Sequence, residues 1–150
     1  MKSVLLVEDD PGDIFIMERA WNKAQFLSVL HVVRDGQQAV DYISGKGQFA
    51  DRNQHPLPCL ILLDIKLPYL SGLHVVKWLR SYTPCATLPA VFLTSSNADM
   101  DIHQAYSYGG NAYLVKPPTP EKLTAMLEDL RNFWMRHNNF PPDCLAIANQ

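Results

Sequence analysis

The sequence predicts an α/β sandwich, a parallel five-stranded sheet with helices on both faces. Short continuous apolar runs of strand length recur along the chain, at residues 4–7, 29–33, 59–63, 90–93 and 113–115. Runs of this kind are typical of strands that are buried on both faces. A segment with helical spacing of apolar residues follows each run. Five such β–α units in alternation predict a doubly wound fold with right-handed crossovers.

The first two units are marked by helix-start and turn signals. After the first strand, Asp10 can cap a helix, Pro11 suits its first position and Asp13 places negative charge in its first turn. The apolar stripe of this helix consists of Ile14, Met17, Trp21 and Ala24. The pair Asp35-Gly36 closes the second strand. A short helix follows it, with inward positions at Ala39, Val40 and Ile43.

The other three units come after a long loop. Residues 45–58 contain two glycines and two prolines and are predicted to form that loop. A helix at about 72–82 precedes the fourth strand, and Ser96 or Asn97 is expected to cap the next helix. The last helix begins at 119–121. Its apolar face is predicted to consist of Leu123, Met126, Leu127, Leu130, Phe133 or Trp134, and His137.

Polar side chains stand where four of the five apolar runs stop. In chain order they are Glu8 and Asp9, Asp64, Thr94, and Lys116. Ligands of doubly wound sheets gather outside the carboxyl ends of the strands, so these side chains are predicted to converge in one pocket. Three carboxylates, a hydroxyl and an ammonium form a set that suits a divalent cation and a phosphoryl group.

These stretches resemble the receiver domain of bacterial two-component response regulators. The matching segments are Val-Glu-Asp-Asp at 7–10, Leu-Asp-Ile-Lys-Leu-Pro at 63–68 with Gly72, Phe-Leu-Thr-Ser at 92–95, and Tyr-Leu-Val-Lys-Pro at 113–117. They occur in the family's order and at roughly its spacing, over about residues 2–136. The resemblance implies a flavodoxin-like fold with strand order 2-1-3-4-5.

A narrower resemblance rests on two further segments. Residues 42–51 lengthen the approach to the third strand, and aromatic and proline residues stand at 133–134 and 140–142. Both features are similar to the stand-alone regulators that are paired with bacterial and cyanobacterial phytochrome histidine kinases. The expected partner is therefore a sensor histidine kinase of the phytochrome class, with an unknown protein downstream.

The resemblance implies that Asp64 is the phosphoacceptor and becomes an aspartyl phosphate. A carboxylate is a competent nucleophile toward phosphorus, but it must attack a group that is itself anionic. The implied cofactor is Mg²⁺, whose charge offsets this repulsion. In the family pattern Asp9 and Asp64 bind the metal directly, Glu8 binds it through water, and Lys66 supplies a backbone carbonyl.

The same resemblance places Thr94 and Lys116 against the phosphoryl group. A cis Lys116–Pro117 bond is expected, because family members use one to aim this lysine and proline makes a cis bond accessible. Tyr113 stands at the family's switch position. If Thr94 moves toward the phosphate, space opens and Tyr113 can turn inward, which alters the face made by the fourth helix, the fifth strand and the fifth helix.

Two residues near this set have simpler interpretations. Asp10 lies where a helix cap is needed, and capping is favoured over metal binding. The Lys66 side chain could pair with the acidic cluster before a metal binds. Alternatively, it is an exposed lysine of which only the backbone matters.

The expected domain organisation is a receiver domain at 1–137 and a tail at 138–150, with no output domain. Phe133, Trp134 and Phe140 are too apolar for a solvated tail. They either pack on the domain as core or form a homodimer interface, where aromatic residues are enriched. The narrower resemblance favours a dimer through the face of the fourth and fifth helices and the tail.

Composition excludes several classes of protein. The net charge of −2 gives no basic surface for nucleic acid. Cys59, Cys85 and Cys144 have no paired or metal-like spacing, which fits a reducing cytosol. No apolar stretch approaches membrane-spanning length. These features predict a cytoplasmic protein.

The leading hypothesis is a signalling switch that catalyses only its own phosphorylation and dephosphorylation. A phosphorelay intermediate that passes the group to a histidine phosphotransfer protein is the alternative within this class. A haloacid-dehalogenase-like phosphatase would need a second acid at the position of Lys66. A flavodoxin-like FMN carrier would need a Ser/Thr/Gly-rich loop at residues 8–10, where the acids present would repel the FMN phosphate.

Overall fold

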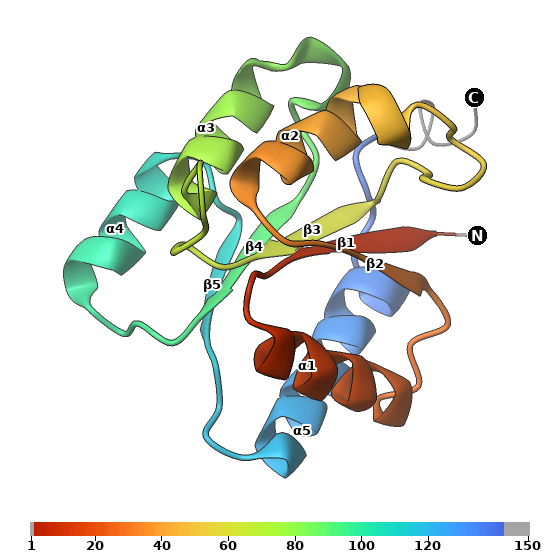
Figure 1. Ribbon diagram of the computed structural model, residues 1–150. Coiled ribbons are helices and arrows are strands. Elements are labelled where there is room, and N and C mark those ends of the chain that lie inside the picture. The colour runs from red at the N-terminus through yellow and green to blue at the C-terminus, as the bar shows by residue number, and fades with distance from the viewer. Residues whose placement is uncertain (1, 143–150) are drawn as a thin grey trace.

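A computed structural model, which describes residues 2–142, confirms the predicted sandwich. The strands form one parallel sheet in the order β2-β1-β3-β4-β5 (Figure 1). Their bounds are β1 Ser3–Val7, β2 Val29–Val33, β3 Leu60–Leu63, β4 Ala90–Thr94 and β5 Ala112–Val115. The expected flavodoxin-like fold class and strand order are therefore correct. Cys144 and the end of the expected tail lie outside the described residues.

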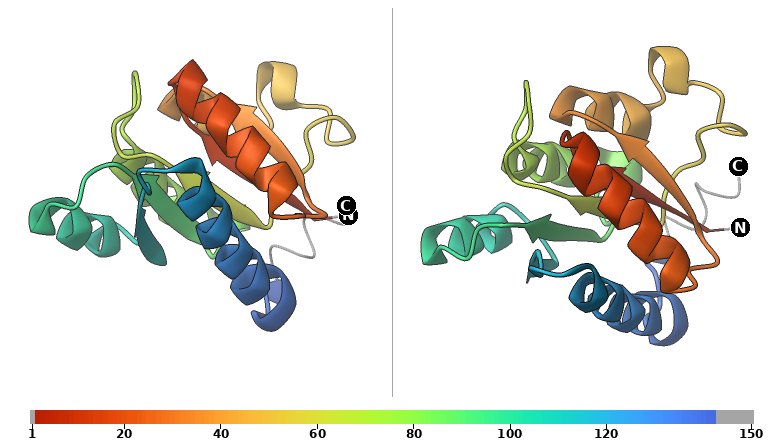
Figure 2. Two further views of the ribbon diagram at one scale, coloured as in Figure 1. Left: turned by 90° about the horizontal axis from the view of Figure 1, so that it is seen from below. Right: turned by 60° about the horizontal axis from the view of Figure 1, so that its bottom comes forward.

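Helices cover both faces of the sheet (Figures 1 and 2). One face carries α1 and α5, and the other carries α2, α3 and α4. Their bounds are α1 Pro11–Lys23, α2 Gly36–Ser44, α3 Gly72–Ser81, α4 Asp99–Ser107 and α5 Pro120–Arg131. A π-helical segment, η3 (Asn132–His137), continues α5. No helix within residues 2–142 has the length and apolar character needed to cross a bilayer.

The sheet divides the core into two clusters, and β1 shows how the sequence supplies both. Leu5 and Val7 pack with residues of α2 and α3, whereas Val4 and Leu6 pack with residues of α1 and α5. All four side chains are buried, because successive strand residues point to opposite faces and helices cover both faces. A strand covered on both sides must therefore be apolar at every position, which explains the continuous runs.

The predicted cap of α4 is wrong. The N-cap residue is Ala98, which makes no side-chain capping bond. The Ser96 hydroxyl instead donates to Asp101 Oδ2 at 2.5 Å and accepts from the Ala98 amide at 3.2 Å. The serine thus reaches an acid in the first turn of α4 rather than one of the free amides of the helix.

The long loop before β3 is held in place by contacts that its sequence pattern does not predict. A short 3-10 helix, η1 (Gly47–Phe49), buries Phe49 in the core. The Arg52 guanidinium donates to the carbonyls of Tyr42 and Ile43, both at 2.7 Å, and so closes the end of α2. The loop is consequently part of the packed domain.

The aromatic residues after α5 have different environments. Phe140 is buried, packs against Trp134, and has the Lys2 ammonium 4.5 Å from its ring centre. Trp134 is half-buried, whereas Phe133 is 55% exposed. Of the two interpretations, packing on the domain therefore describes Phe140 and Trp134. Only Phe133 among the three presents most of its ring to solvent.

Candidate functional site

The site forms at the carboxyl edge of the sheet, where strand register sets the positions of its residues. Val7 pairs with Leu63, so Glu8 and Asp64 leave adjacent strands at the same level. Thr94 pairs with Val115, which places Lys116 one residue beyond this level on β5. Hydrogen bonds extend the register past the strands: the Asp64 amide donates to the Val7 carbonyl at 3.2 Å and the Lys116 amide to the Thr94 carbonyl at 2.8 Å.

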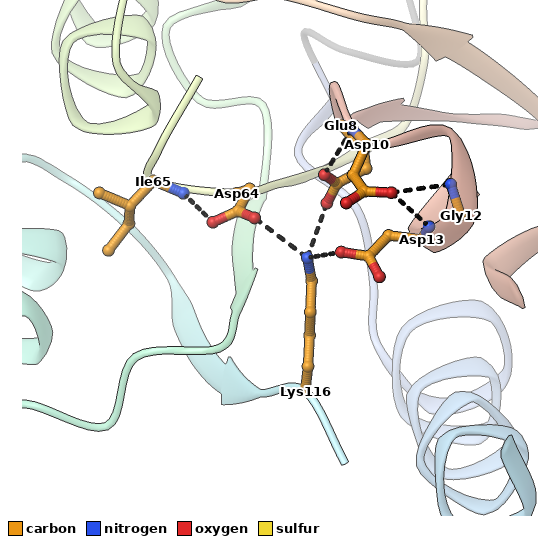
Figure 3. Close-up of polar contacts among 7 residues, drawn as sticks. All are labelled: Glu8, Asp10, Gly12, Asp13, Asp64, Ile65 and Lys116. Atoms are coloured by element: carbon orange, nitrogen blue, oxygen red, sulfur yellow. Dashed lines mark hydrogen bonds and ion pairs between the residues drawn. The ribbon is translucent and has the colours of Figure 1, made fainter. Parts of the chain in front are cut away.

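The centre of the site is the ammonium of Lys116, which points at three carboxylates (Figure 3). Lys116 Nζ lies 2.7 Å from Glu8 Oε2, 3.0 Å from Asp64 Oδ2 and 3.0 Å from Asp13 Oδ2. Two of these acids come from strand ends, and the third comes from the first turn of α1. The predicted convergence of Glu8, Asp64 and Lys116 is therefore present.

Two local features fix the backbone on which these side chains stand. Asp10 Oδ1 accepts from the amides of Gly12 at 2.7 Å and Asp13 at 3.2 Å, which makes Asp10 the predicted cap of α1. Gly72 begins α3 directly against the backbone of Asp64, which follows β3. A Cβ atom at Gly72 would lie 2.0 Å from the Asp64 carbonyl oxygen, so only glycine permits this approach.

Burial and ion pairing have opposite effects on the pKa values of Glu8 and Lys116. Burial raises the pKa of Glu8 above its ordinary value, although the hydrogen bond from Lys116 acts in the other direction. Burial by itself would lower the pKa of Lys116, but the hydrogen bonds to Glu8, Asp13 and Asp64 raise it. The lysine is therefore charged at neutral pH. Its charge compensates the burial of Glu8.

The remaining predicted site residues lie around this centre. Thr94 is buried at the end of β4, and Asp9 is half-buried, with its carbonyl accepting from Arg34 Nη2 at 3.2 Å. Tyr113 lies against the core, where its hydroxyl donates to the Ser96 carbonyl at 2.8 Å. The Lys66 side chain is exposed and forms no ion pair within residues 2–142, which favours the simpler interpretation of its side chain.

Two findings differ from the sequence-based expectations. No peptide bond within residues 2–142 is cis, so the expected cis Lys116–Pro117 bond is wrong. The lysine reaches its three partners with the trans bond, which is also the more stable isomer for a proline. The second difference is Asp13, which was expected only to favour the start of a helix. The contact between Asp13 and Lys116 depends on how α1 packs against the sheet.

The donor atoms at this edge fit a hard divalent cation in their chemistry. Glu8, Asp9 and Asp64 offer carboxylate oxygens, the ligands that Mg²⁺ prefers. In the structure, however, two of these carboxylates bind the Lys116 ammonium. Across residues 2–142, no three acidic, histidine or cysteine side chains are arranged to hold a metal ion. A cation at this edge would therefore share Glu8 and Asp64 with the Lys116 ammonium.

The chain belongs to the response regulator receiver domain family, which matches residues 4–128. Members of this family are signalling switches rather than metabolic enzymes. Among curated relatives, the probable methanogenesis regulatory protein FilR2 of Methanothrix harundinacea is 32% identical over 92% of this chain and 86% of its own length. Response regulator Rcp1 of Synechocystis sp. is 29% identical over 93% of both chains.

Solved structures relate the chain to regulators of light signalling. Response regulator RPA3017, of red light signalling in R. palustris, has a TM-score of 0.89 and 37% identity over 94% of this chain and 99% of its own. The phosphorylated cyanobacterial phytochrome response regulator RcpA has a TM-score of 0.85 and 29% identity over 93% and 98%. A Mn²⁺-bound form of Rcp1 has a TM-score of 0.82 and 28% identity over 94% and 99%.

Proposed function

We propose that this protein is a response regulator that accepts a phosphoryl group on Asp64 from a sensor histidine kinase and thereby changes a protein-interaction face. The observation that carries this proposal is the Lys116 ammonium held 3.0 Å from Asp64 Oδ2, at the edge where Glu8, Asp9 and Thr94 also stand. A nucleophilic carboxylate beside a fixed cation and a hydroxyl is what phosphoryl transfer needs, because that reaction depends on positioning and charge neutralisation.

In the proposed step an Asp64 carboxylate oxygen attacks phosphorus and forms the oxygen–phosphorus bond of an acyl phosphate. The bond from phosphorus to the kinase's histidine nitrogen breaks, and its electron pair stays on the imidazole. Lys116 and Thr94 bind phosphoryl oxygens, and the amide of Ile65, 2.7 Å from Asp64 Oδ1, orients the carboxylate. Asp9, Asp64 and the Lys66 carbonyl, with Glu8 through water, would hold Mg²⁺, whose positive charge would offset anion repulsion.

The output of the proposed switch is a change at Thr94 that is passed to the loop between β4 and α4, which Tyr113 contacts. A phosphoryl group adds between about 1.5 and 2 negative charges at neutral pH, and Thr94 moves to contact it. Tyr113 is already held against the core by its hydrogen bond to Ser96, in the loop between β4 and α4. Movement of this loop is thereby coupled to the face of α4, β5 and α5, on which a downstream protein would dock.

Incubation with acetyl phosphate, with and without Mg²⁺, tests the chemistry. We expect intact-mass measurement to show a gain of one phosphoryl group that needs Mg²⁺, is lost on chelation and is absent in Asp64→Asn. The matched control is Asp10→Asn, which removes a neighbouring carboxylate while keeping a good helix cap. Equal labelling of Asp64→Asn and the wild type would assign the acceptor to another residue.

The proposed donor is a phytochrome histidine kinase in the cytoplasm, supported by the likeness to RPA3017 and RcpA. The relay alternative has the same site and differs only in what removes the phosphoryl group. Labelled protein mixed with an isolated histidine phosphotransfer domain separates the two roles. Transfer to that domain within the lifetime of the aspartyl phosphate supports the relay, and retention on Asp64 supports a terminal switch.

We also propose a homodimer through the α4–β5–α5 face, with Phe133 as a contact. Phe133 is 55% exposed beside an apolar groove that is lined by residues such as Leu114, Met126 and Trp134. Sedimentation velocity of Phe133→Ser, with and without beryllofluoride, should show weaker association than the wild type. Val29→Ser is the control, because Val29 is similarly exposed on β2, at the edge of the sheet opposite β5. A wild type that is monomeric in both conditions would exclude the dimer.

A further inference from the structure

The ammonium of Lys116 has all of its hydrogen-bond donors in use. Its contacts to Glu8, Asp13 and Asp64 are 2.7, 3.0 and 3.0 Å long. A lysine ammonium carries three N–H donors and accepts no hydrogen bond. A phosphoryl oxygen can therefore bind Lys116 only after one of these three contacts has broken.

The three contacts differ in how easily they can be released. The Glu8 side chain is 5% exposed and would be left as a buried charge without its partner. Asp64 is 12% exposed and is itself the group that receives phosphorus. The Asp13 side chain is 45% exposed, so water can solvate its carboxylate when the lysine leaves. The contact with Asp13 is therefore the least costly one to break.

The surroundings of Asp13 permit this release without unfolding α1. Asp10 holds the backbone of the first turn through the amides of Gly12 and Asp13, so the backbone stays in place while the side chain turns. A cavity of about 110 Å³ lies beside the pair, lined among others by Asp13, Lys116 and Pro117. The carboxylate has room to rotate into this space.

We propose that Asp13 is a positioning residue that holds the Lys116 ammonium in the unphosphorylated protein and slows phosphorylation of Asp64, because the lysine must leave Asp13 to contact the phosphoryl group. This inference rests on the proposed phosphorylation of Asp64. Asp13 touches neither phosphorus nor metal in this scheme, and acts only through the lysine.

The test is the rate of labelling of Asp13→Asn by acetyl phosphate, with Mg²⁺ titrated to saturation for each variant. We expect an increase of about threefold, which corresponds to about 0.6 kcal/mol of barrier and to the strength of a partly exposed ion pair. Asp13→Glu keeps the charge and the reach to Lys116, and should label at close to the wild-type rate. Asp10→Asn removes a charge in the same turn and should leave the rate unchanged.

A double-mutant cycle with Lys116→Gln distinguishes action through the lysine from a general loss of negative charge. Asp13→Asn should not accelerate labelling in the Lys116→Gln background. Circular dichroism and urea unfolding verify that each variant is folded, and Asp13→Ser serves as a second neutral variant if Asp13→Asn is not.

The outcomes separate this inference from the function on which it rests. Acceleration in a folded neutral variant, absent without Lys116, supports the role of Asp13. Rates equal to that of Asp10→Asn, or acceleration that persists in Lys116→Gln, would overturn it while Asp64-dependent labelling remained intact. Labelling of Asp64→Asn would instead overturn the proposed function.

Discussion

Two basic side chains, Arg80 in α3 and Lys116 after β5, each collect oxygen atoms from distant parts of the chain. Arg80 binds neutral oxygens: its guanidinium donates to the Leu88 carbonyl at 2.7 Å, to the Gly109 carbonyl at 2.9 and 2.7 Å, and to Asn111 Oδ1 at 2.8 Å. The partners of Lys116 are three carboxylates. Arg80 therefore binds neutral oxygens, mostly of the backbone, and Lys116 binds charged ones.

This difference separates a structural cation from a functional one. Backbone carbonyls are fixed by the strands and loops that carry them, and the planar guanidinium fits several of them at once. Carboxylates sit on rotatable side chains and can exchange their partner for a metal or for water. Arg80 thus joins α3 to the loops before β4 and β5, whereas Lys116 holds a position that another anion can take over.

The largest expected effect comes from Arg80→Met. Loss of the guanidinium leaves carbonyls of the loops before β4 and β5 without their donor, which should lower the free energy of unfolding by about 3 kcal/mol. Urea denaturation measures this loss. Arg80→Lys keeps the charge without the planar fork and should recover only part of it. A loss below about 1 kcal/mol would remove the distinction between the two cations.

Lys116→Gln should affect chemistry more than folding. We expect labelling of Asp64 to slow by a factor on the order of 100, because a donor to the transferring group is lost. The free energy of unfolding at neutral pH should fall by about 1 to 2 kcal/mol, since the buried Glu8 loses its cation.

The effect of added Mg²⁺ on stability gives a further test of the Lys116→Gln variant. A ligand that binds only the folded state stabilises it, and in Lys116→Gln the ammonium no longer competes for Glu8 and Asp64. Added Mg²⁺ should therefore raise the melting temperature more in Lys116→Gln than in the wild type or in Arg80→Met. Equal shifts in all three proteins would contradict the view that the ammonium and the metal compete for the same carboxylates.

The smallest effect is expected at Tyr42, whose hydroxyl donates to the Pro56 carbonyl at 3.0 Å and so ties α2 to the loop before β3. Tyr42→Phe should lower the free energy of unfolding by about 1 kcal/mol at pH 7.

The pH dependence of this effect follows from the Tyr42 phenol. Burial raises the pKa of Tyr42 from 10.0 to about 12. The folded protein therefore holds the proton more tightly than the unfolded chain does. The stabilisation is complete below pH 10 and is lost as the pH rises to about 12. Urea unfolding at pH 7 and above pH 10 should show a smaller alkaline loss for Tyr42→Phe, and parallel curves would contradict this assignment.

The residues that stop the apolar runs show what local patterns can establish. Strands at 4–7 and 59–63 were identifiable because burial on both faces demands uninterrupted apolar side chains. The carboxyl ends of parallel strands share one edge of a sheet, so Glu8, Asp64 and Lys116 were correctly expected to meet. Asp10 was recognisable as a cap because capping depends on amides only two or three residues away.

Other features escaped prediction because they depend on contacts across the fold. Ser96 or Asn97 was expected to cap α4, but the N-cap is Ala98 and the Ser96 hydroxyl binds Asp101. The apolar side chain of Phe140 was compatible with either a core position or an interface position. Its burial follows from where η3 brings the chain back against Trp134 and Lys2.

The sequence by itself determined the five β–α units, the parallel sheet and the polar residues at its edge, because periodicity and strand ends are local properties of the chain. Only the tertiary structure decided which charges touch. The packing of α1 against α5 sets whether Asp13 reaches Lys116. A hydrogen bond forms within about 3 Å, and no spacing in a sequence fixes a distance between helices that finely.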